Sequence, residues 1–311
     1  MRISGLLTAW IATLFLALPA PAWNATGHRV IAAIAYERLT PAARTRVDGL
    51  LRAHPDYAAF IRGIPDRGAP DDARARSREA FIAAAVWPDN IKGDPRFYDD
   101  TRKDAQPTPS LPGFPDMKRH TNWHYYDTPY TPDGAKSVKQ APPNALSELP
   151  RLIKEIGKAP APIAAYDLPW IEHVAGDVHQ PLHCVSRILK SMPDGDAGGN
   201  RVFVTPGNNL HAVWDGALGR DTSDAFVTRL AADIVKEHPA PSHIEESPKK
   251  WIKEGAEIAR LQVYTFGLET GTREHPIVLP ANYAENAQRV ARAQVAMAGY
   301  RLAAVLNDRL K

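Results

Sequence analysis

The sequence contains two histidine–aspartate pairs with the same spacing, four residues apart: His173 with Asp177, and His211 with Asp215. On a helix, side chains at this spacing project from one face, about one turn from each other. Imidazole nitrogens and carboxylate oxygens in closely spaced groups are ligands that zinc takes in proteins. The alternative interpretation is a set of surface or capped histidines, but the repeated spacing argues against it. The two pairs therefore predict a metal site.

A further candidate follows the first pair. Pro181 cannot extend a helix, so the chain turns there and can bring His183 back toward the first pair. Residues of the same chemical types also occur earlier in the chain. In chain order, the complete candidate set is Trp23, His28, Asp89, His124, His173, Asp177, His183, His211 and Asp215.

The chain has 11 histidines, and those outside this set have a simpler interpretation. His179 falls two residues after Asp177, off the face expected for ligands, and is predicted to lie at the surface or to support a ligand. The others have no patterned partners and are predicted to be solvated: His54, His120, His238, His243 and His275.

Composition and charge favour a folded protein without a strongly basic surface. The chain has 311 residues, of which 44% are hydrophobic and 23% charged, enough for one sizeable core or two small ones. Its formal net charge is +3, which becomes +2 when Arg2 is lost with the first 22 residues, because these contain no other charged side chain. A protein that binds the phosphates of duplex DNA or RNA by charge alone is far more basic. Any nucleic-acid contact must therefore be made locally, in a site.

The first 22 residues have the pattern of a secretory signal peptide. Arg2 precedes an apolar run that ends in Ala20-Pro21-Ala22, and cleavage after Ala22 would make Trp23 the first residue of the mature protein. The run is too short for a membrane anchor, and no later run is apolar enough to span a bilayer. We therefore expect a secreted or periplasmic protein.

Cysteine usage adds to this interpretation. Cys184 is the only cysteine, so an intramolecular disulfide is excluded. Stability must then come from core packing and from bound metal. A bacterial periplasm or the extracellular space fits this composition better than a eukaryotic secretory route.

Apolar residues recur at helical spacing through most of the chain. Asp167 is predicted to cap the central helix that carries His173, with Pro169 in its first turn. Pro150 is predicted to delay or kink the helix that contains it. The remaining predicted helices cover residues 26–39, a short segment that opens at Thr40-Pro41, and residues 77–87, 144–157, 222–236, 249–266 and 281–309.

Two stretches are predicted to be irregular: residues 93–143, and residues 186–208 with a short hairpin around Val202-Phe203-Val204. An ordered loop as long as the first is usually functional. Because nearly all the periodicity is helical, we expect an all-α fold: a single, mainly helical domain over residues 23–311, with long irregular loops.

Taken together, the motifs resemble the zinc-dependent single-strand-specific nucleases and 3′-nucleotidases first known from fungi and plants. The pattern of that family is an N-terminal Trp, a His five residues later, Trp-x-Asp, His-aromatic-x-Asp, His-x-x-x-Asp-x-x-Gln-Pro-Leu-His and Asn-Leu-His-x-x-Trp-Asp. Each part is present here with matching spacing, from Trp23 to Asp215, and a helical remainder follows. The resemblance implies a phospholipase C/nuclease-like helical fold around a trinuclear zinc cleft.

The resemblance also implies which residues hold the three Zn²⁺ ions. The first zinc would be held by Asp89, His124, His173 and Asp177. The second would be held by the α-amine and carbonyl of Trp23, by His28, and by Asp177 as a bridge. The third would be held by His183, His211 and Asp215. The second site would be complete only after signal-peptide cleavage has freed the amine of Trp23.

Such a centre has a clear chemical use. Two zinc ions that share a carboxylate can hold a bridging water whose pKa falls to near ~7, which gives a hydroxide nucleophile at neutral pH. In-line attack on phosphorus then requires stabilisation of charge on the equatorial and departing oxygens. Lys92, three residues after Asp89, matches the cation of the family and would neutralise that charge. Asp89 would also orient the nucleophile.

Three further residues match substrate contacts of the family. Tyr125 occupies the position of a residue that stacks on a nucleobase, and Asp127 the position of a carboxylate that binds the edge of the base. Asn200, in Gly-Gly-Asn, matches a polar substrate contact. Stacking is worth about 1–3 kcal/mol per base and tolerates any sequence. A buried base must first be unstacked, which favours single strands.

The leading hypothesis is therefore a secreted endonuclease that hydrolyses single-stranded RNA and DNA to 5′-phosphate products and also acts on 3′-nucleotides. The resemblance implies no protein partner. One alternative is a zinc-dependent phospholipase C, although the last ligand here is Asp215 where the phospholipases have Glu. The other is a zinc-binding or adhesion module with structural metals. Carboxylate ligands and Lys92 argue against that alternative.

Overall fold

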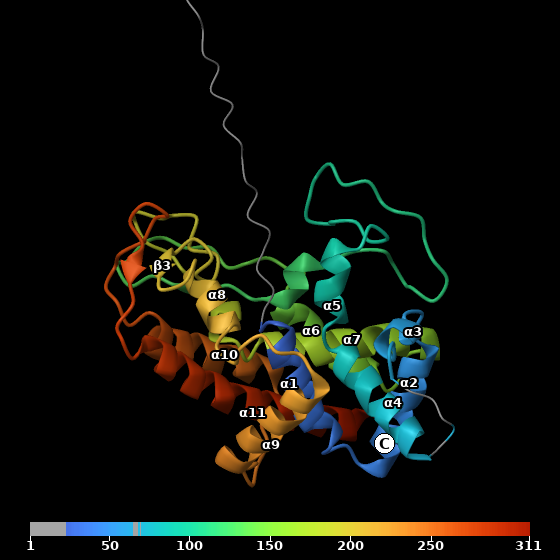
Figure 1. Ribbon diagram of the computed structural model, residues 1–311. Helices are drawn as coiled ribbons and strands as arrows, with labels where there is room; N and C mark the ends of the chain where they lie inside the picture. Colours follow the sequence, from blue (N-terminus) through green and yellow to red (C-terminus); the bar gives the residue numbers. More distant parts are fainter. Residues whose placement is uncertain (1–22, 65–67, 69) are drawn as a thin grey trace, which may run out of the picture.

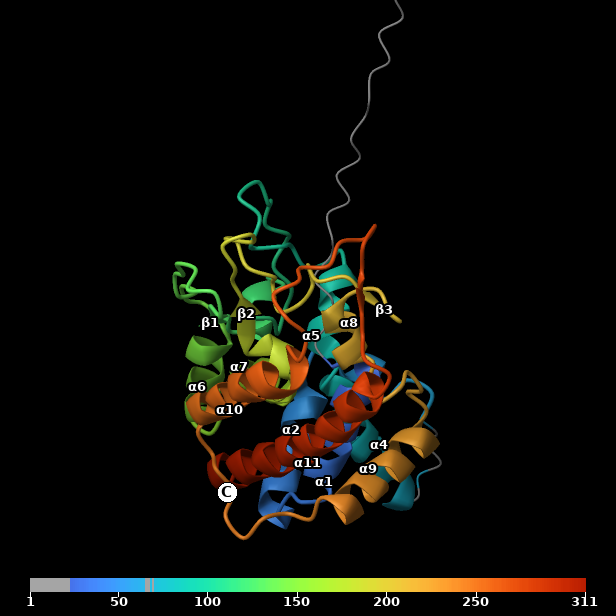
Figure 2. The same ribbon diagram turned by 90° about the vertical axis from the view of Figure 1, so that its left-hand side faces the viewer.

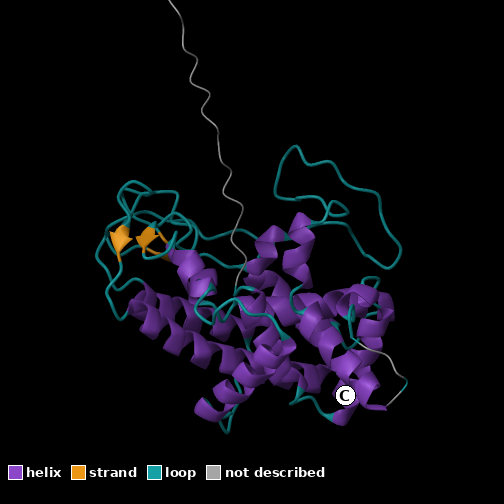
Figure 3. Ribbon diagram, in the orientation of Figure 1, coloured by secondary structure: helices purple, strands orange, loops and turns teal. Residues whose placement is uncertain are grey.

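The computed structural model describes residues 23–64, 68 and 70–311, and the predicted signal peptide over residues 1–22 lies outside the described residues. As predicted, the fold is all-α, with a few two- and three-residue strands (Figure 3). The helices are α1 (Ala25–Tyr36), α2 (Pro41–Ala53), α3 (Tyr57–Phe60), α4 (Pro70–Ala84), α5 (Trp87–Asn90), α6 (Ala145–Glu155), α7 (Ala161–Asp177), α8 (Leu210–Asp215), α9 (Asp224–Glu237), α10 (Pro248–Ile258) and α11 (Tyr283–Arg309). Short helical turns are η1 (Ile91–Gly93), η2 (Thr121–His124), η3 (Pro181–His183) and the π-helical turn η4 (Ala259–Val263).

Helix α7 lies at the centre of the helical body and is buried from Ala164 to its last residue. It contacts α1, α2, α4, α5, α6 and α11. Helix α1 in turn packs against α11, α9 and α4. Figures 1 and 2 show the helices packed together at one end, while the long loops gather at the other, around α5 and α8. Helix α7 ends at Asp177, one of the candidate ligands.

The loops are joined by two short parallel strand pairs. Strand β1 (Thr128–Tyr130) pairs with β2 (Val185–Arg187), and β3 (Val204–Thr205) pairs with β4 (Ile277–Val278). The hairpin predicted around Val202-Phe203-Val204 is present only as one antiparallel bridge, between Phe203 and Asn209. The sequence pattern missed β4, because the partner of β3 lies far away in the chain.

The helix starts follow local capping rules in most places. The Thr40 side chain accepts a hydrogen bond from the backbone N–H of Ala43, with Pro41 in the first turn, as predicted. Asn144 and Ser147 form a reciprocal capping box at the start of α6, and Pro150 lies inside that helix without delaying its start.

The predicted cap of the central helix is wrong. Helix α7 begins at Ala161, so Asp167 and Pro169 both lie inside it. Asp167 is buried, and burial raises the pKa of its carboxyl to about 6. The proline removes one helical hydrogen bond, but the burial of nearly every side chain of α7 outweighs this local cost. Helix α4 likewise begins earlier than the predicted 77.

Within the described ranges, no helix is both long and apolar enough to cross a membrane.

The contact between α1 and α11 depends on a glycine. A Cβ atom on Gly299 would lie 2.6 Å from Cγ2 of Ile34, so the helices can approach this closely only without a side chain there. We predict that Gly299→Ala lowers the free energy of unfolding by roughly 1–3 kcal/mol, because it overpacks a filled core. The matched control is Gly49→Ala in α2, where a Cβ meets nothing within 4 Å and should be neutral or stabilising. Chemical denaturation measures both, and equal unfolding free energies for the two variants would contradict the prediction.

Candidate metal centre

The candidate residues come from six separate elements. His28 lies in α1, Asp89 in α5, His124 at the end of η2, and His183 at the end of η3. The two pairs His173/Asp177 and His211/Asp215 lie one turn apart on α7 and α8, as the spacing predicts. The side chains form three groups, and within each group the ligand atoms lie within 4.8 Å of one another. The groups are His28, Asp89 and His173; His124, His173 and Asp177; and His183, His211 and Asp215.

The first two groups share His173 and form one continuous cluster around Asp177. Oδ1 of Asp177 lies 3.2 Å from Nε2 of His28, and Oδ2 lies 2.9 Å from Nδ1 of His124. Nε2 of His173 lies 3.3 Å from the same Oδ2 and 3.5 Å from Oδ1 of Asp89. The two oxygens of Asp177 thus face different histidines, which is the arrangement that a bridging carboxylate requires.

The hydrogen bonds of the imidazoles fix which nitrogen faces the cluster. Nδ1 of His173 donates to the carbonyl of Ala85 at 2.7 Å, so in the Nδ1–H tautomer Nε2 carries a lone pair. That lone pair lies 2.9 Å from Nδ1 of His124 and close to two carboxylates. The rings of His28 and His173 stack with their centroids 3.9 Å apart. Lone pairs and carboxylate oxygens that converge in this way suit a cation.

The third group shows the same feature more simply. Nδ1 of His183 donates to the carbonyl of His124 at 2.8 Å, and Nδ1 of His211 donates to the carbonyl of Gly198 at 2.7 Å. The two Nε2 atoms then face each other at 3.0 Å with lone pairs. Burial lowers the pKa of His211 to about 4 and that of His183 well below its usual value, so both rings are neutral at pH 7. Neither ring has a proton to share, and a metal ion satisfies both.

Gln180 completes this group and was missed as a functional residue. Its Nε2 donates to Oδ1 of Asp215 at 2.7 Å, and its Oε1 accepts from the backbone N–H of Leu182 at 2.6 Å. Oδ2 of Asp215 is left facing Nε2 of His211 at 3.5 Å. Gln180 therefore fixes the orientation of the Asp215 carboxylate, which is a candidate ligand. The signal was its place in the Gln-Pro-Leu-His run, between the two halves of the motif.

Several polar atoms of the centre are buried without a hydrogen-bond partner among the described residues: both ring nitrogens of His28, Nε2 of His124 and Oδ1 of Asp177. Burial raises the pKa of Asp177 and lowers that of His28, so placing these groups together is unfavourable in the protein alone. Buried, unsatisfied groups of this kind need an explanation, and metal binding supplies one.

Lys92 lies at the more open side of the cluster. Its Nζ is 2.6 Å from Oδ1 of Asp89, and the two side chains are 18% and 10% exposed. Burial alone raises the pKa of Asp89, but Lys92, together with His173, holds it well below its usual range. Asp89 is thus an ionised carboxylate that is paired with the ammonium group of Lys92 beside the cluster.

The start of the described chain lies beside the centre. The Trp23 side chain is fully buried, and the Asn24 side chain caps α1 by accepting from the backbone N–H groups of Thr26 and Gly27. The Asn24 N–H also donates to the carbonyl of Asp215 at 3.3 Å. These contacts put the main chain of Trp23 next to α8 and one turn before His28.

The predicted substrate residues lie on the loops that border the centre. Tyr125 and Asp127 follow His124 on an extended segment leading into β1, where residues two apart share a face. Tyr126, between them, donates its N–H to the carbonyl of His183 at 2.9 Å, which ties this segment to η3. Both Tyr125 and Asp127 are half-buried, and the Tyr125 hydroxyl donates to Oδ1 of Asn122 at 3.0 Å.

Asn200 lies two residues after Gly198, whose carbonyl accepts the hydrogen bond from His211. Gly198 has φ +60°, and a Cβ there would overlap the carbonyl of Leu182. Nδ2 of Asn200 donates to the carbonyl of Ala197 at 2.9 Å. The glycine therefore allows the loop that carries Asn200 to lie against η3.

Three histidine predictions need correction. His54 and His120 are buried rather than solvated, and His179, predicted to lie at the surface or to support a ligand, is buried as well. His179 donates from Nδ1 to the carbonyl of Ala175, and its Nε2 accepts from Arg301 at 3.0 Å, so it is a satisfied core residue. His120 stacks on Trp123 with ring centroids 3.7 Å apart. Their tertiary contacts have no signature in the local sequence. His243 and His275 are exposed as predicted, and His238 is partly buried.

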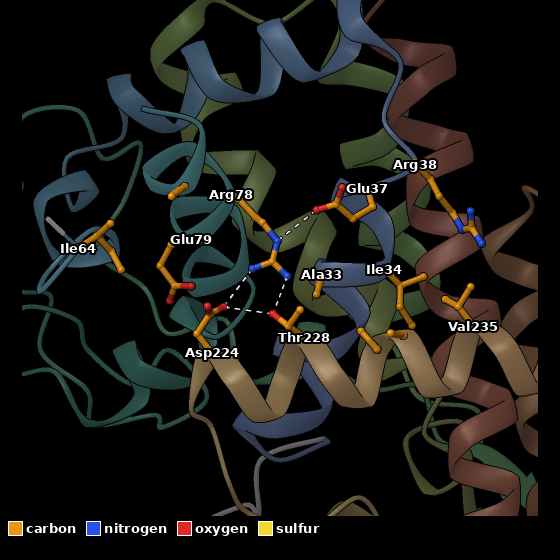
Figure 4. A pocket seen from close by; sticks show the side chains of 13 residues that line it. Ala33, Ile34, Glu37, Arg38, Ile64, Arg78, Glu79, Asp224, Thr228 and Val235 are labelled. Carbon is orange, nitrogen blue, oxygen red and sulfur yellow. Dashed lines mark hydrogen bonds and ion pairs between the residues drawn. The ribbon is translucent and has the colours of Figure 1, made fainter. Parts of the chain in front are cut away.

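A cavity of about 560 Å³ lies away from this centre, between α1, α4 and α9 (Figure 4). Arg78 crosses it and contacts Glu37, Asp224 and Thr228. None of the candidate ligands lines this cavity.

The fold and the site define a class of protein: a mainly helical domain with buried groups of histidines and aspartates of the kind that hold metal ions. Residues 23–311 match the family described as S1/P1 Nuclease, and the chain belongs to that family. It is also similar to Nuclease S1 of Aspergillus oryzae (strain ATCC 42149 / RIB 40), with 28% identity over 160 residues, 45% of this chain and 53% of the relative. The chain thus spans about half the length of the curated relative that it matches.

Proposed function

We propose that the protein is a zinc-dependent endonuclease that cleaves single-stranded RNA and DNA to 5′-phosphate products and also removes phosphate from 3′-nucleotides. The observation that carries the proposal is the group in which the imidazole lone pairs of His183 and His211, fixed by backbone carbonyls, face each other beside Asp215. The cluster of imidazoles and aspartates around Asp177 adds to it. Membership of the S1/P1 nuclease family supports it.

Three zinc ions fit these residues. Asp89, His124, His173 and Asp177 would hold one ion, and His28, with the α-amine and carbonyl of Trp23 and the second oxygen of Asp177, would hold another. His183, His211 and Asp215 would hold the third. When bound, zinc supplies Lewis-acid stabilisation of phosphate charge and lowers the pKa of coordinated water to near ~7.

The contribution of the protein's own residues follows from their positions. Asp89 is ionised beside Lys92 and would orient the attacking water, while the ammonium of Lys92 would neutralise charge that develops on the phosphate oxygens. Tyr125 would stack on the base next to the cleaved bond, and Asp127 would bind its edge. Asn200 would make a further polar contact to the substrate. Because a stacked base in a duplex cannot enter such a site, single strands are the preferred substrates.

The proposed domain is residues 23–311, released by cleavage after Ala22 and then secreted or periplasmic. The family match begins at residue 23, where the cleavage signal would end, and this supports the boundary. The released α-amine of Trp23 would lie beside α8 and His28, where the main chain of Trp23 lies in the structure.

The test of this function uses the protein that begins at Trp23, with three substrates: a single-stranded oligonucleotide, the same sequence as a duplex, and phosphatidylcholine vesicles. We expect rapid cleavage of the single strand to fragments with 5′-phosphates, identified by mass spectrometry, and much slower cleavage of the duplex. Hydrolysis of phosphatidylcholine without cleavage of nucleic acid would instead identify a phospholipase. A zinc-loaded protein inactive on all three would be a binding module.

The role of Lys92 has its own test. Lys92→Ala should lower kcat on the single-stranded substrate by about 10²–10³, because it removes one preorganised donor to transition-state charge. Zinc content, measured by inductively coupled plasma mass spectrometry, should stay the same, since Lys92 is not a proposed ligand. Lys103→Ala, on an exposed loop, is the matched control. Unchanged turnover of Lys92→Ala would remove the proposed role.

A further inference from the structure

A cavity of about 390 Å³ lies on the loops next to the metal centre. It combines one face of the segment after His124 with residues of two other loops. Its walls are formed by Asp127, Lys136, Ser137, Val138, Gln140, Ser186, Ile188, Pro193 and Asp194. No candidate ligand lines it, but Asp127 and Ser186 on its walls each follow a candidate ligand by three residues, on two segments that the Tyr126–His183 hydrogen bond ties together. The cavity therefore borders the centre, where it can receive a group attached to a phosphate bound there.

The orientation of the Gln140 amide is fixed by a backbone donor. Its Oε1 accepts from the N–H of Asp127 at 2.9 Å, so the other end of the amide is the NH₂ group. Over the part of the chain that the structure describes, this NH₂ group has no hydrogen-bond partner. The main-chain carbonyl of Gln140 accepts from Nδ2 of Asn144, the N-cap of α6, which anchors the residue. Gln140 therefore offers two free donors from a held position.

The carboxyl group of Asp127 is the complementary acceptor. No described side chain donates to it. Burial and the nearby Asp196 raise its pKa to about 6, so at pH 8 it is a carboxylate. Ser186, the other polar group deep in the cavity, contacts Asp196 at 3.5 Å. Asp196 itself is engaged by the Tyr264 hydroxyl at 2.7 Å. The other polar residues of the walls, Lys136, Ser137 and Asp194, are exposed to solvent. Asp127 and Gln140 are thus the half-buried groups left to bind a ligand.

The pattern that these groups present is a carboxylate beside an amide donor. A carboxylate binds best to two adjacent N–H donors, as in other bidentate pairs. Guanine offers such donors at N1–H and N2–H₂, followed by an acceptor at O6. Adenine and uracil each offer one donor group flanked by acceptors, and cytosine offers one donor group beside a single acceptor. None of them offers a second donor to the other carboxylate oxygen. A buried polar group left unpaired in this way is costly.

We propose that the Asp127–Gln140 pair makes the enzyme selective for guanine on the 5′ side of the cleaved bond. The carboxylate accepts from N1–H and N2–H₂, and the Gln140 NH₂ donates to O6. This inference rests on the proposed nuclease function and adds a base preference to it. A bidentate base contact of this kind discriminates by roughly tenfold to hundredfold.

The test compares kcat/KM at pH 8 for the dinucleotides GpA, IpA, ApA, CpA and UpA. We expect GpA to exceed ApA, CpA and UpA by about tenfold or more, with IpA between them, because inosine lacks only the N2 amine. Gln140→Glu keeps the oxygen that accepts from Asp127 but loses the donor to O6, so the ratio of GpA to ApA should fall toward one. The ratio is the readout because a general loss of folded enzyme lowers both rates equally.

Two controls separate the outcomes. Gln106→Glu makes the same charge change on an exposed loop and should leave the ratio unchanged. If Gln140→Glu does not fold, Asp127→Asn should collapse the same ratio, because it replaces the carboxylate acceptor. Equal kcat/KM for all the dinucleotides in an active wild-type enzyme would overturn the guanine selectivity alone. No activity on any dinucleotide or on the base-free diester bis(p-nitrophenyl) phosphate would overturn the nuclease function as well.

Discussion

The structure depends on a set of nitrogen and oxygen lone pairs that converge in a buried place. Backbone carbonyls hold the Nδ1 protons of His173, His183 and His211, and thereby direct the Nε2 lone pairs at one another and at aspartates. Burial disfavours charge on His183 and His211, so proton sharing does not relieve the repulsion between their lone pairs. A cation does relieve it. The helical body must therefore supply enough packing energy to hold ligands together before the metal arrives.

That requirement accounts for the architecture. The ligands come from six elements, and a side chain held to within a fraction of an ångström needs a rigid support. Helix α7 supplies it: it is buried along most of its length and contacts six other helices. The long loops carry the proposed substrate contacts Tyr125, Asp127 and Gln140 at the edge of this support, where loop residues can vary while the candidate ligands stay in place.

The sequence predicted most of the helices, and the placement of His173 and Asp177 one turn apart on one of them, because both depend on local spacing. It failed where tertiary contacts decide. Asp167 is a residue type that often caps helices, yet α7 begins earlier and holds Asp167 in its buried interior. His179 looks like a surface residue, yet Arg301, far away in the chain, provides its partner. Gln140 lies in an irregular stretch, and only the fold brings it against Asp127.

The most direct test of the metal centre is thermal unfolding of the protein that begins at Trp23, as zinc is added to the metal-free form. Binding to the folded state at 1,000 times Kd stabilises by about 4 kcal/mol per site. At about 2–4 °C per kcal/mol, the expected rise in Tm is on the order of 10 °C or more, saturating near three equivalents of zinc. Magnesium at the same concentration should give little rise, because it prefers oxygen ligands. An unchanged Tm, in protein shown to be free of metal at the start, would contradict the account.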